Sequence, residues 1–236
     1  MDEQLNEPVS PEPAGVAGWF AVWMKAVTKP NEQTFVDLAS SAAGKTSTAL
    51  LWIFIGFLVN FFFASLVQGA VMKQTFQQLG VDVGSGGGFG TSLISAICGA
   101  PIGAVIGVIF FAAFTGVVQW IAKMFGGKGT FEQLLYVFAA ITVPFSLVSS
   151  VLTLLGAIPF VGACFGILSL ALSIYILVLE VMAVKGVNDF GWGQAAGSLL
   201  LPGFVIFCCV AVVVGGAIAA LGPTIRDTFN QVNPGF

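Results

Sequence analysis

The sequence predicts an all-α, polytopic membrane protein: a bundle of five transmembrane helices preceded by short amphipathic or interfacial helices. Only 8% of the 236 residues are charged and 57% are hydrophobic, with a mean hydropathy of +0.99. A water-soluble domain of this length would need far more charge to cover its surface. Uncharged stretches separate Lys45 from Lys73, Asp82 from Lys123, Glu132 from Glu180, and Asp189 from Arg226. A bilayer core about 30 Å thick takes roughly 20 helical residues, so the third stretch holds two spans and each of the others one.

The first 47 residues are expected to lie outside the spans. Residues 1–15 are acidic and contain three prolines without an apolar core, which indicates a disordered tail rather than a signal peptide. Residues 16–47 are expected to form amphipathic helices at the cytoplasmic surface or in the membrane interface. The first of these helices combines Lys25 and Lys29 with apolar residues at helical spacing: Trp19, Phe20, Trp23, Met24 and Val27.

Pro30 is expected to end this first helix, since the residue before a proline avoids helical dihedral angles. A second short helix is expected over residues 31–43, with Glu32 near its positive N-terminus. Its buried face would carry Phe35, Leu38 and Ala42. In the first helix, aromatic residues beside lysine favour a position in the headgroup region. An ordinary soluble helix packed on the membrane domain is the alternative.

The membrane domain is expected over residues 48–222, with spans near 49–71, 93–122, 133–155, 160–183 and 195–221. Residues 223–236 would form a short external tail. The glycine-rich segment 80–90 is expected to be a flexible loop, and residues 126–129 a turn. Residues 156–159 are expected to form a tight hairpin, because two spans must fit between Gln133 and Val181.

The orientation follows from the basic residues in alternate non-membrane segments. One side carries Lys25, Lys29, Lys45, Lys123, Lys128 and Lys185, whereas the other carries Lys73 and Arg226. Six basic residues against two predict a cytoplasmic N-terminus and an external C-terminus.

The residue types that the chain lacks exclude several classes of catalytic and metal site. There is no histidine, which excludes Ser-His and Cys-His catalysis, His-ligated haem and most catalytic zinc sites within this chain. The four cysteines, which we expect to pack between helices, are Cys98, Cys164, Cys208 and Cys209. Basic residues do not cluster, so nucleic-acid binding has no support. We therefore predict no enzyme activity, no cofactor and no metal site.

Small residues recur every four positions within the predicted spans. The second span carries Ser95, Gly99, Gly103 and Gly107, the fourth carries Gly162 and Gly166, and the fifth carries Ala211, Gly215 and Ala219. Such ridges let helix backbones approach closely where hydrophobicity cannot drive association. They indicate a compact bundle or a homo-oligomer, and the sequence leaves both possibilities open.

A few polar residues lie at membrane depth and are candidates for function. Beside the proline expected to kink the third span, Pro144, they are Asn60, Ser146, Ser149 and Ser150. One interpretation makes them the lining of a substrate path, and the favoured one makes them hydrogen-bonding groups between helices. Glu180 is a further candidate, because an intramembrane acid is costly. Its place near the end of the fourth span, with Lys185 nearby, favours a snorkelling or paired charge.

The order of these features resembles the Yip domain family, membrane proteins named for interacting with Ypt/Rab GTPases. The resemblance rests on Trp19 to Pro30 with Phe35, on the final span, and on the stretches FGGKGTFEQLLYVFAAITVP and IYILVLEVMAVKGVNDFGWGQAA. It covers about residues 19–221 and implies five spans with a cytoplasmic N-terminus, in a compact member of the prokaryotic type. The family's Asp-Leu-Tyr-Gly-Pro type motif is missing, so Rab-type GTPase binding is not expected.

Two functional hypotheses follow. The leading one is a non-enzymatic scaffold, interaction or membrane-organising subunit in a prokaryotic cytoplasmic membrane. Its partners would be membrane lipids and either a second copy of this chain or other membrane protein subunits. The alternative is a transporter or channel subunit for a small or lipidic solute, and an intramembrane enzyme is a distant third.

Overall fold

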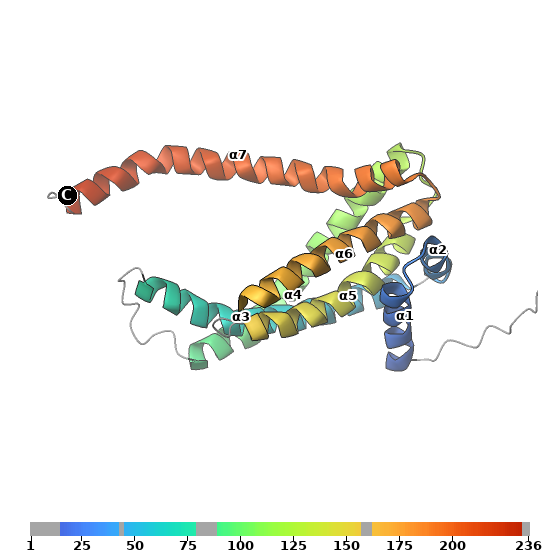
Figure 1. Ribbon diagram of the computed structural model, residues 1–236, viewed down its shortest axis with the longest axis horizontal. Coiled ribbons are helices and arrows are strands. Elements are labelled where there is room, and N and C mark those ends of the chain that lie inside the picture. Colours follow the sequence, from blue (N-terminus) through green and yellow to red (C-terminus); the bar gives the residue numbers. More distant parts are fainter. Residues whose placement is uncertain (1–14, 43–44, 79–88, 157–161, 233–236) are drawn as a thin grey trace, which may run out of the picture.

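The computed structural model describes the backbone of residues 15–42, 45–78, 89–156 and 162–232. Side-chain surroundings are described for residues 15–42, 45–68, 93–94, 96–156, 164–205 and 207–216. The described chain is helical and contains no strand, which confirms the all-α prediction (Figure 1). Its helices are α1 (Val16–Thr28), α2 (Glu32–Ser40), α3 (Thr46–Gln78), α4 (Phe89–Met124), α5 (Phe131–Gly156), α6 (Gly162–Asn188) and α7 (Trp192–Val232).

Helices α3 to α7 each contain a stretch long and apolar enough to cross a membrane. These stretches are Thr46–Gln68, Ala96–Met124, Phe131–Gly156, Cys164–Asn188 and Trp192–Gly216. The prediction of five membrane-spanning helices is confirmed among the described residues. The short helices α1 and α2 precede the spans, as the apolar spacing and Pro30 indicated.

Several helices are longer than the spans predicted from hydropathy. Helix α7 continues to Val232, so the backbone of residues 223–232, expected as a tail, is helical. Helix α4 already begins at Phe89, inside the segment expected as a glycine loop. Polar residues mark the end of an apolar span, but a helix can continue through them. The helices are therefore longer than the spans predicted from hydropathy. The rest of that loop and the hairpin residues 157–159 lie outside the described residues.

Capping residues fix two of the helix starts. The Asn31 side chain accepts a hydrogen bond from the Thr34 amide at 2.7 Å and so caps α2. Before α5, the Thr130 amide donates to the Gln133 side chain at 2.9 Å, and the Gln133 amide donates to the Thr130 hydroxyl at 3.3 Å. This reciprocal pair is a capping box, which satisfies amides that have no partner within the helix.

The two ends of the bundle differ in packing. At one end of the bundle α3, α5 and α7 begin, α4 and α6 end, and α1 and α2 pack against the spans (Figure 1). We call this end the packed end. Most of the largest buried side chains belong to it, among them Trp52, Tyr136, Phe35, Phe138, Leu134, Leu135 and Leu179. The face predicted for the second short helix is buried there, since Phe35, Leu38 and Ala42 are all buried.

The opposite end, which we call the open end, is held together much less. Helix α7 contacts α4 and α6 near its start and then leaves the bundle as it runs toward the C-terminus (Figure 1). Its buried Pro202 is followed by a segment in which every described side chain, in residues 203–205 and 207–216, is exposed. The final span therefore runs largely without neighbours from its own chain.

Candidate functional site

An aromatic cluster joins α1 to the spans at the packed end. Trp52 of α3 is fully buried, and its ring lies 5.7 Å from Trp23, 6.0 Å from Trp19 and 5.2 Å from Tyr136 of α5, measured between centroids. The two tryptophans of α1 meet Trp52 edge to face, which is a favoured arrangement of aromatic rings. The ammonium group of Lys45 lies 5.5 Å from the centre of the Tyr136 ring. The cluster therefore fixes α1 against the membrane domain.

Helix α6 holds the segment from α1 to α2 in place. The Tyr175 hydroxyl donates a hydrogen bond to the Val27 carbonyl at 2.8 Å, near the end of α1. The ammonium group of Lys185 forms an ion pair with Glu32 at the start of α2. Gly186 permits a close approach here, because a Cβ atom at this position would lie 3.1 Å from the Glu32 carbonyl oxygen.

A buried hydrogen-bond network connects the α4–α5 loop to the end of α6. The Gln119 side-chain amide donates to the Gly129 carbonyl and to the Asn188 side-chain oxygen, both at 2.8 Å. Asn188 donates in turn to the Val184 carbonyl at 3.1 Å and to Gln119 at 3.3 Å. A Cβ atom on Gly127 would come within 2.6 Å of the Asn188 oxygen, so only glycine fits there.

The α4–α5 loop and the residue that follows α6 also meet at the surface. Lys128 and Asp189 form an exposed ion pair with an N–O distance of 2.8 Å. The hydrogen bond and the charge of each partner raise the pKa of Lys128 and lower the pKa of Asp189. The Lys128 amide also donates to the Asn188 carbonyl at 3.1 Å. The contact between Gln119 and Asn188 was not predicted from the sequence, where neither residue was a candidate.

Three of the polar candidates come together between α3 and α5. The Asn60 side-chain amide lies 3.4 Å from the Ser150 hydroxyl and 3.5 Å from the Ser146 carbonyl oxygen. A Cβ atom on Gly56 would lie only 2.7 Å from the Ser146 hydroxyl, so the two helices are closely packed at this point. The Ser149 backbone carbonyl instead accepts a hydrogen bond from the Thr153 hydroxyl within α5. Pro144 lies inside α5, and the helix continues through it.

The small-residue ridge on α4 faces α3 over part of its length. A Cβ atom on Gly107 would lie 2.5 Å from the Phe57 ring, and one on Gly103 would lie 3.2 Å from the Phe61 ring. Positions Gly99, Gly166 and Gly215 have no neighbouring atom within 4 Å of such a Cβ atom. The surroundings of Ser95 and Gly162 lie outside the described side chains.

One expectation, about the cysteines, is corrected, and the choice between a snorkelling and a paired Glu180 stays a prediction. Lys185 pairs with Glu32, and within the described residues no hydrogen bond reaches the partly buried Glu180 carboxylate. All four cysteines are exposed instead of packed between helices. The physical reason is that lipid tails are as apolar as a bundle interior, so hydrophobicity does not draw a cysteine inward. No group of metal-ligating side chains occurs among the described residues.

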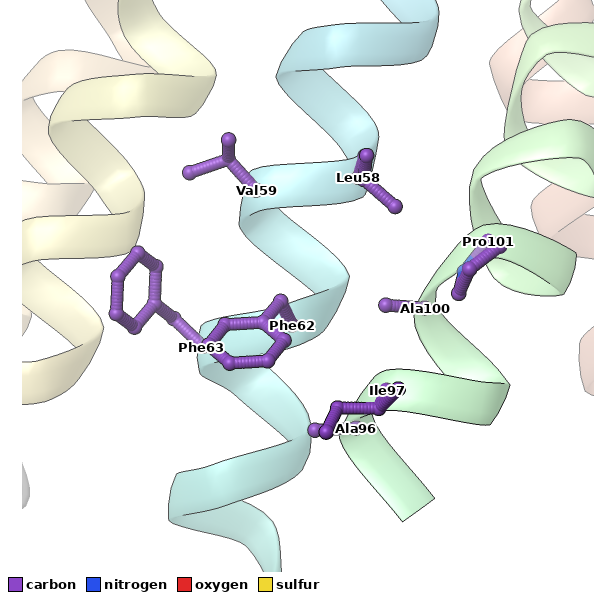
Figure 2. A pocket seen from close by; sticks show the side chains of 8 residues that line it. All are labelled: Leu58, Val59, Phe62, Phe63, Ala96, Ile97, Ala100 and Pro101. Carbon is purple, nitrogen blue, oxygen red and sulfur yellow. The ribbon is translucent and has the colours of Figure 1, made fainter. Parts of the chain in front are cut away.

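An apolar groove lies between α3 and α4 toward the open end. Its volume is about 330 Å³, and it is lined by Leu58, Val59, Phe62, Phe63, Ala96, Ile97, Ala100 and Pro101. In Figure 2, Leu58 on α3 and Ala100 and Pro101 on α4 project into the space between the two helices. No candidate polar residue lines this groove. Its surface can take hydrocarbon, but it offers no side-chain hydrogen bond.

One comparison with known proteins gives a match. The model of the Yip1 domain family matches residues 24–214, a range that begins inside α1 and ends within α7. No curated protein and no solved structure matches the chain.

Proposed function

The chain belongs to the Yip1 domain family and is an integral membrane protein, and from this premise we propose that it acts as a non-enzymatic membrane-organising subunit. In this proposal the packed end is a fixed platform, and the open end holds another membrane helix. The partner is a second copy of this chain, with a different membrane protein subunit as the alternative.

The departure of α7 from its own bundle carries the proposal. A lipid-exposed helix costs nothing by itself, because lipid tails are as apolar as its side chains. A helix packed on its neighbours nevertheless gains van der Waals contact, and α7 forgoes this gain over residues 203–205 and 207–216. Ala211 and Gly215, four positions apart on α7, would let another helix backbone approach closely.

The native cysteines test this proposal without new labels. Cys208 and Cys209 lie on the exposed part of α7, whereas Cys98 and Cys164 are exposed on α4 and α6. We would oxidise membranes that contain the chain with only the α7 pair, and compare them with membranes that contain only the other pair. Because a disulfide requires Cα atoms within about 7 Å, the α7 pair should give a covalent dimer and the control pair should not. A monomer in both samples would count against a second copy on α7.

We also propose that the packed end faces the cytoplasm of a prokaryotic cell. This end carries Lys25, Lys29, Lys45, Lys123, Lys128 and Lys185, while Lys73 and Arg226 belong to the parts of α3 and α7 nearer the open end. A membrane-impermeant maleimide added to whole cells should leave a cysteine at Lys29→Cys unlabelled and should label it after lysis. Labelling of intact cells would reverse the orientation.

A second candidate function, binding of a lipidic solute, is favoured by the α3–α4 groove. Its wholly apolar lining at membrane depth suits one acyl chain. Binding of a small polar solute has no such support, because Asn60, Ser146 and Ser150 pack between α3 and α5. Ile97→Trp should fill the groove and lower the amount of lipid that co-purifies, measured by mass spectrometry. Ile102→Trp, on another exposed face of α4, is the matched control.

A further inference from the structure

Helix α1 lies across the bundle and beside it, not beyond its end. Figure 1 shows α1 running across the direction of α3 and α5. Its partner Trp52 is six residues into α3 and Tyr136 is five residues into α5, so these residues lie about 9 and 8 Å inside the helix ends at 1.5 Å per residue. Both partners belong to stretches apolar enough to cross a membrane. Helix α1 therefore lies level with the spans' outer turns.

The surface of α1 divides into three faces. The inner face, Gly18, Val22 and Ala26, is buried against the membrane domain. A second face is apolar but exposed, with Val16 at 72%, Phe20 at 60% and Met24 at 41% of full side-chain exposure. We call this second face the α1 stripe. The third face is formed by Ala17, Ala21, Lys25, Thr28 and Lys29, all exposed.

The position of the α1 stripe identifies what covers it. The stripe is continuous with the aromatic face of Trp19 and Trp23, which packs on the spans. At this level the surfaces of the spans themselves face lipid, since they carry exposed side chains such as Trp120 and Met124. Lysines on the third face suit the anionic phosphates of a leaflet, and an interfacial helix of this kind buries its apolar face about 5–10 Å deep.

We propose that α1 is an interfacial anchor whose stripe, Val16, Phe20 and Met24, inserts between the lipids of the leaflet at the packed end. Lys25 and Lys29 remain at the level of the phosphates, with their aliphatic stems along the apolar surface. Lys25 also keeps its contact with Asp37 of α2, at 3.5 Å. This proposal concerns contact with lipid alone and does not depend on a partner for α7.

Spin-label accessibility in the full chain tests the anchor. The four cysteines are replaced by alanine, and a nitroxide is placed at Phe20→Cys or at the control Ala21→Cys, which lies on the third face of the same helix turn. The chain is reconstituted into nanodiscs of phosphatidylcholine and phosphatidylglycerol. The label at position 20 should collide several-fold more often with oxygen than with a water-soluble nickel complex, and the label at position 21 should show the reverse. Equal water access at both positions would overturn the proposal.

If the cysteine-free variant does not fold, a photocrosslinker placed in the chain with its native cysteines tests the same proposal. Phe20→p-benzoylphenylalanine keeps an aromatic ring at the stripe, and Thr28→p-benzoylphenylalanine is the control on the third face. After irradiation in the same nanodiscs, mass spectrometry should find phospholipid attached at position 20 and little at position 28. Attachment to a second polypeptide at position 20 would show that protein covers the stripe and would overturn the proposal. An absence of lipid adducts at position 20 would overturn it as well.

Discussion

The packed end and the open end both carry large apolar side chains, but they differ in how many of these are buried. Phe35 and Phe138 are fully buried at the packed end, whereas Phe204 and Phe207 on α7 are exposed at 68% and 70%. Within a membrane, hydrophobicity places a helix in the bilayer but does not press it against its neighbours. What distinguishes the packed end is the set of specific contacts among Trp52, its aromatic neighbours and the Gln119–Asn188 network. Specific side-chain contacts, rather than hydropathy, therefore distinguish the packed end from the open end.

The largest effect should come from removing the centre of the aromatic cluster. Trp52→Ala deletes the ring that joins α1, α3 and α5, and a buried Trp→Ala change costs about 3–5 kcal/mol. The matched change at the open end is Phe204→Ala, which should alter the free energy of unfolding by no more than about 0.5 kcal/mol. Unfolding by increasing SDS in mixed micelles measures both. Equal losses in the two variants would abolish the distinction between the ends.

The buried network should give the next largest effect. Asn188→Ala removes the Asn188 side chain from Gln119, which keeps only its bond to the Gly129 carbonyl inside the packed end, and we expect a loss of about 2–3 kcal/mol. A double-mutant cycle with Gln119→Ala isolates the coupling between the two side chains. For comparison, Asn60→Ala removes the longer contacts between α3 and α5 and should cost roughly 0.6 kcal/mol. If Asn60→Ala cost more than Asn188→Ala, the network would not be the stronger contact.

Two glycines of α4, Gly107 and Gly99, test the comparison between packed and unpacked positions, with a smaller expected change in stability. Gly107→Ala places a methyl group against the Phe57 ring and should destabilise the α3–α4 contact by about 1–2 kcal/mol. Gly99→Ala, which meets open space, should stabilise the helix by about 0.5–1 kcal/mol. The same SDS titration provides the measurement. A shared sign for both changes would mean that the α4 ridge makes no selective contact.

The smallest effect should come from the exposed ion pair of Lys128 and Asp189. Asp189→Asn removes the charge, and asparagine tolerates the positive φ of 54° at this position. Folding lowers the pKa of Asp189 below 3.8, so its contribution is complete above pH 3.8 and is lost as the pH falls through the folded value. Folding raises the pKa of Lys128 above 10.5, so its contribution is complete below pH 10.5 and is lost as the pH rises through the folded value.

The difference in unfolding free energy between the wild type and Asp189→Asn should therefore be small and constant between pH 3.8 and pH 10.5. It should decline to zero as the pH falls through the folded pKa of Asp189 or rises through the folded pKa of Lys128. Unfolding titrations repeated across the pH range measure it. A difference that persists at pH values well below the folded pKa of Asp189 would assign the effect to something other than the ion pair.

Much of the fold was predictable because it follows from local patterns. The charge-free stretches predicted five spans, and the spacing of Phe35 and Leu38 predicted the buried face of α2. Ala42 is buried as well, but it lies in the turn after the helix. The long-range contacts were not predictable in the same way. Gln119 and Asn188 are 69 residues apart, and neither shows in the sequence that it pairs with the other.

The candidate site was predictable only in part, for a similar reason. Asn60, Ser146 and Ser150 were singled out as polar groups at membrane depth, but their spacing does not say whether they line a path or join helices. Gly99 and Gly103 share one period, yet only Gly103 meets the neighbouring helix. Lys185 is close to Glu180 along the chain, whereas its observed partner Glu32 is 153 residues away. Periodicity gives the face of a helix but not what lies opposite that face.

The central claim is that the packed end is complete and that α7 is free to hold another membrane helix. Native mass spectrometry of the full chain, taken from its membrane into nanodiscs without harsh detergent, tests this claim most directly. We predict a mass that corresponds to two copies, or to one copy with a second membrane polypeptide, and we expect it to persist in Ile97→Trp, where only the groove is changed. A strictly monomeric chain that carries lipid and no second polypeptide would contradict the claim.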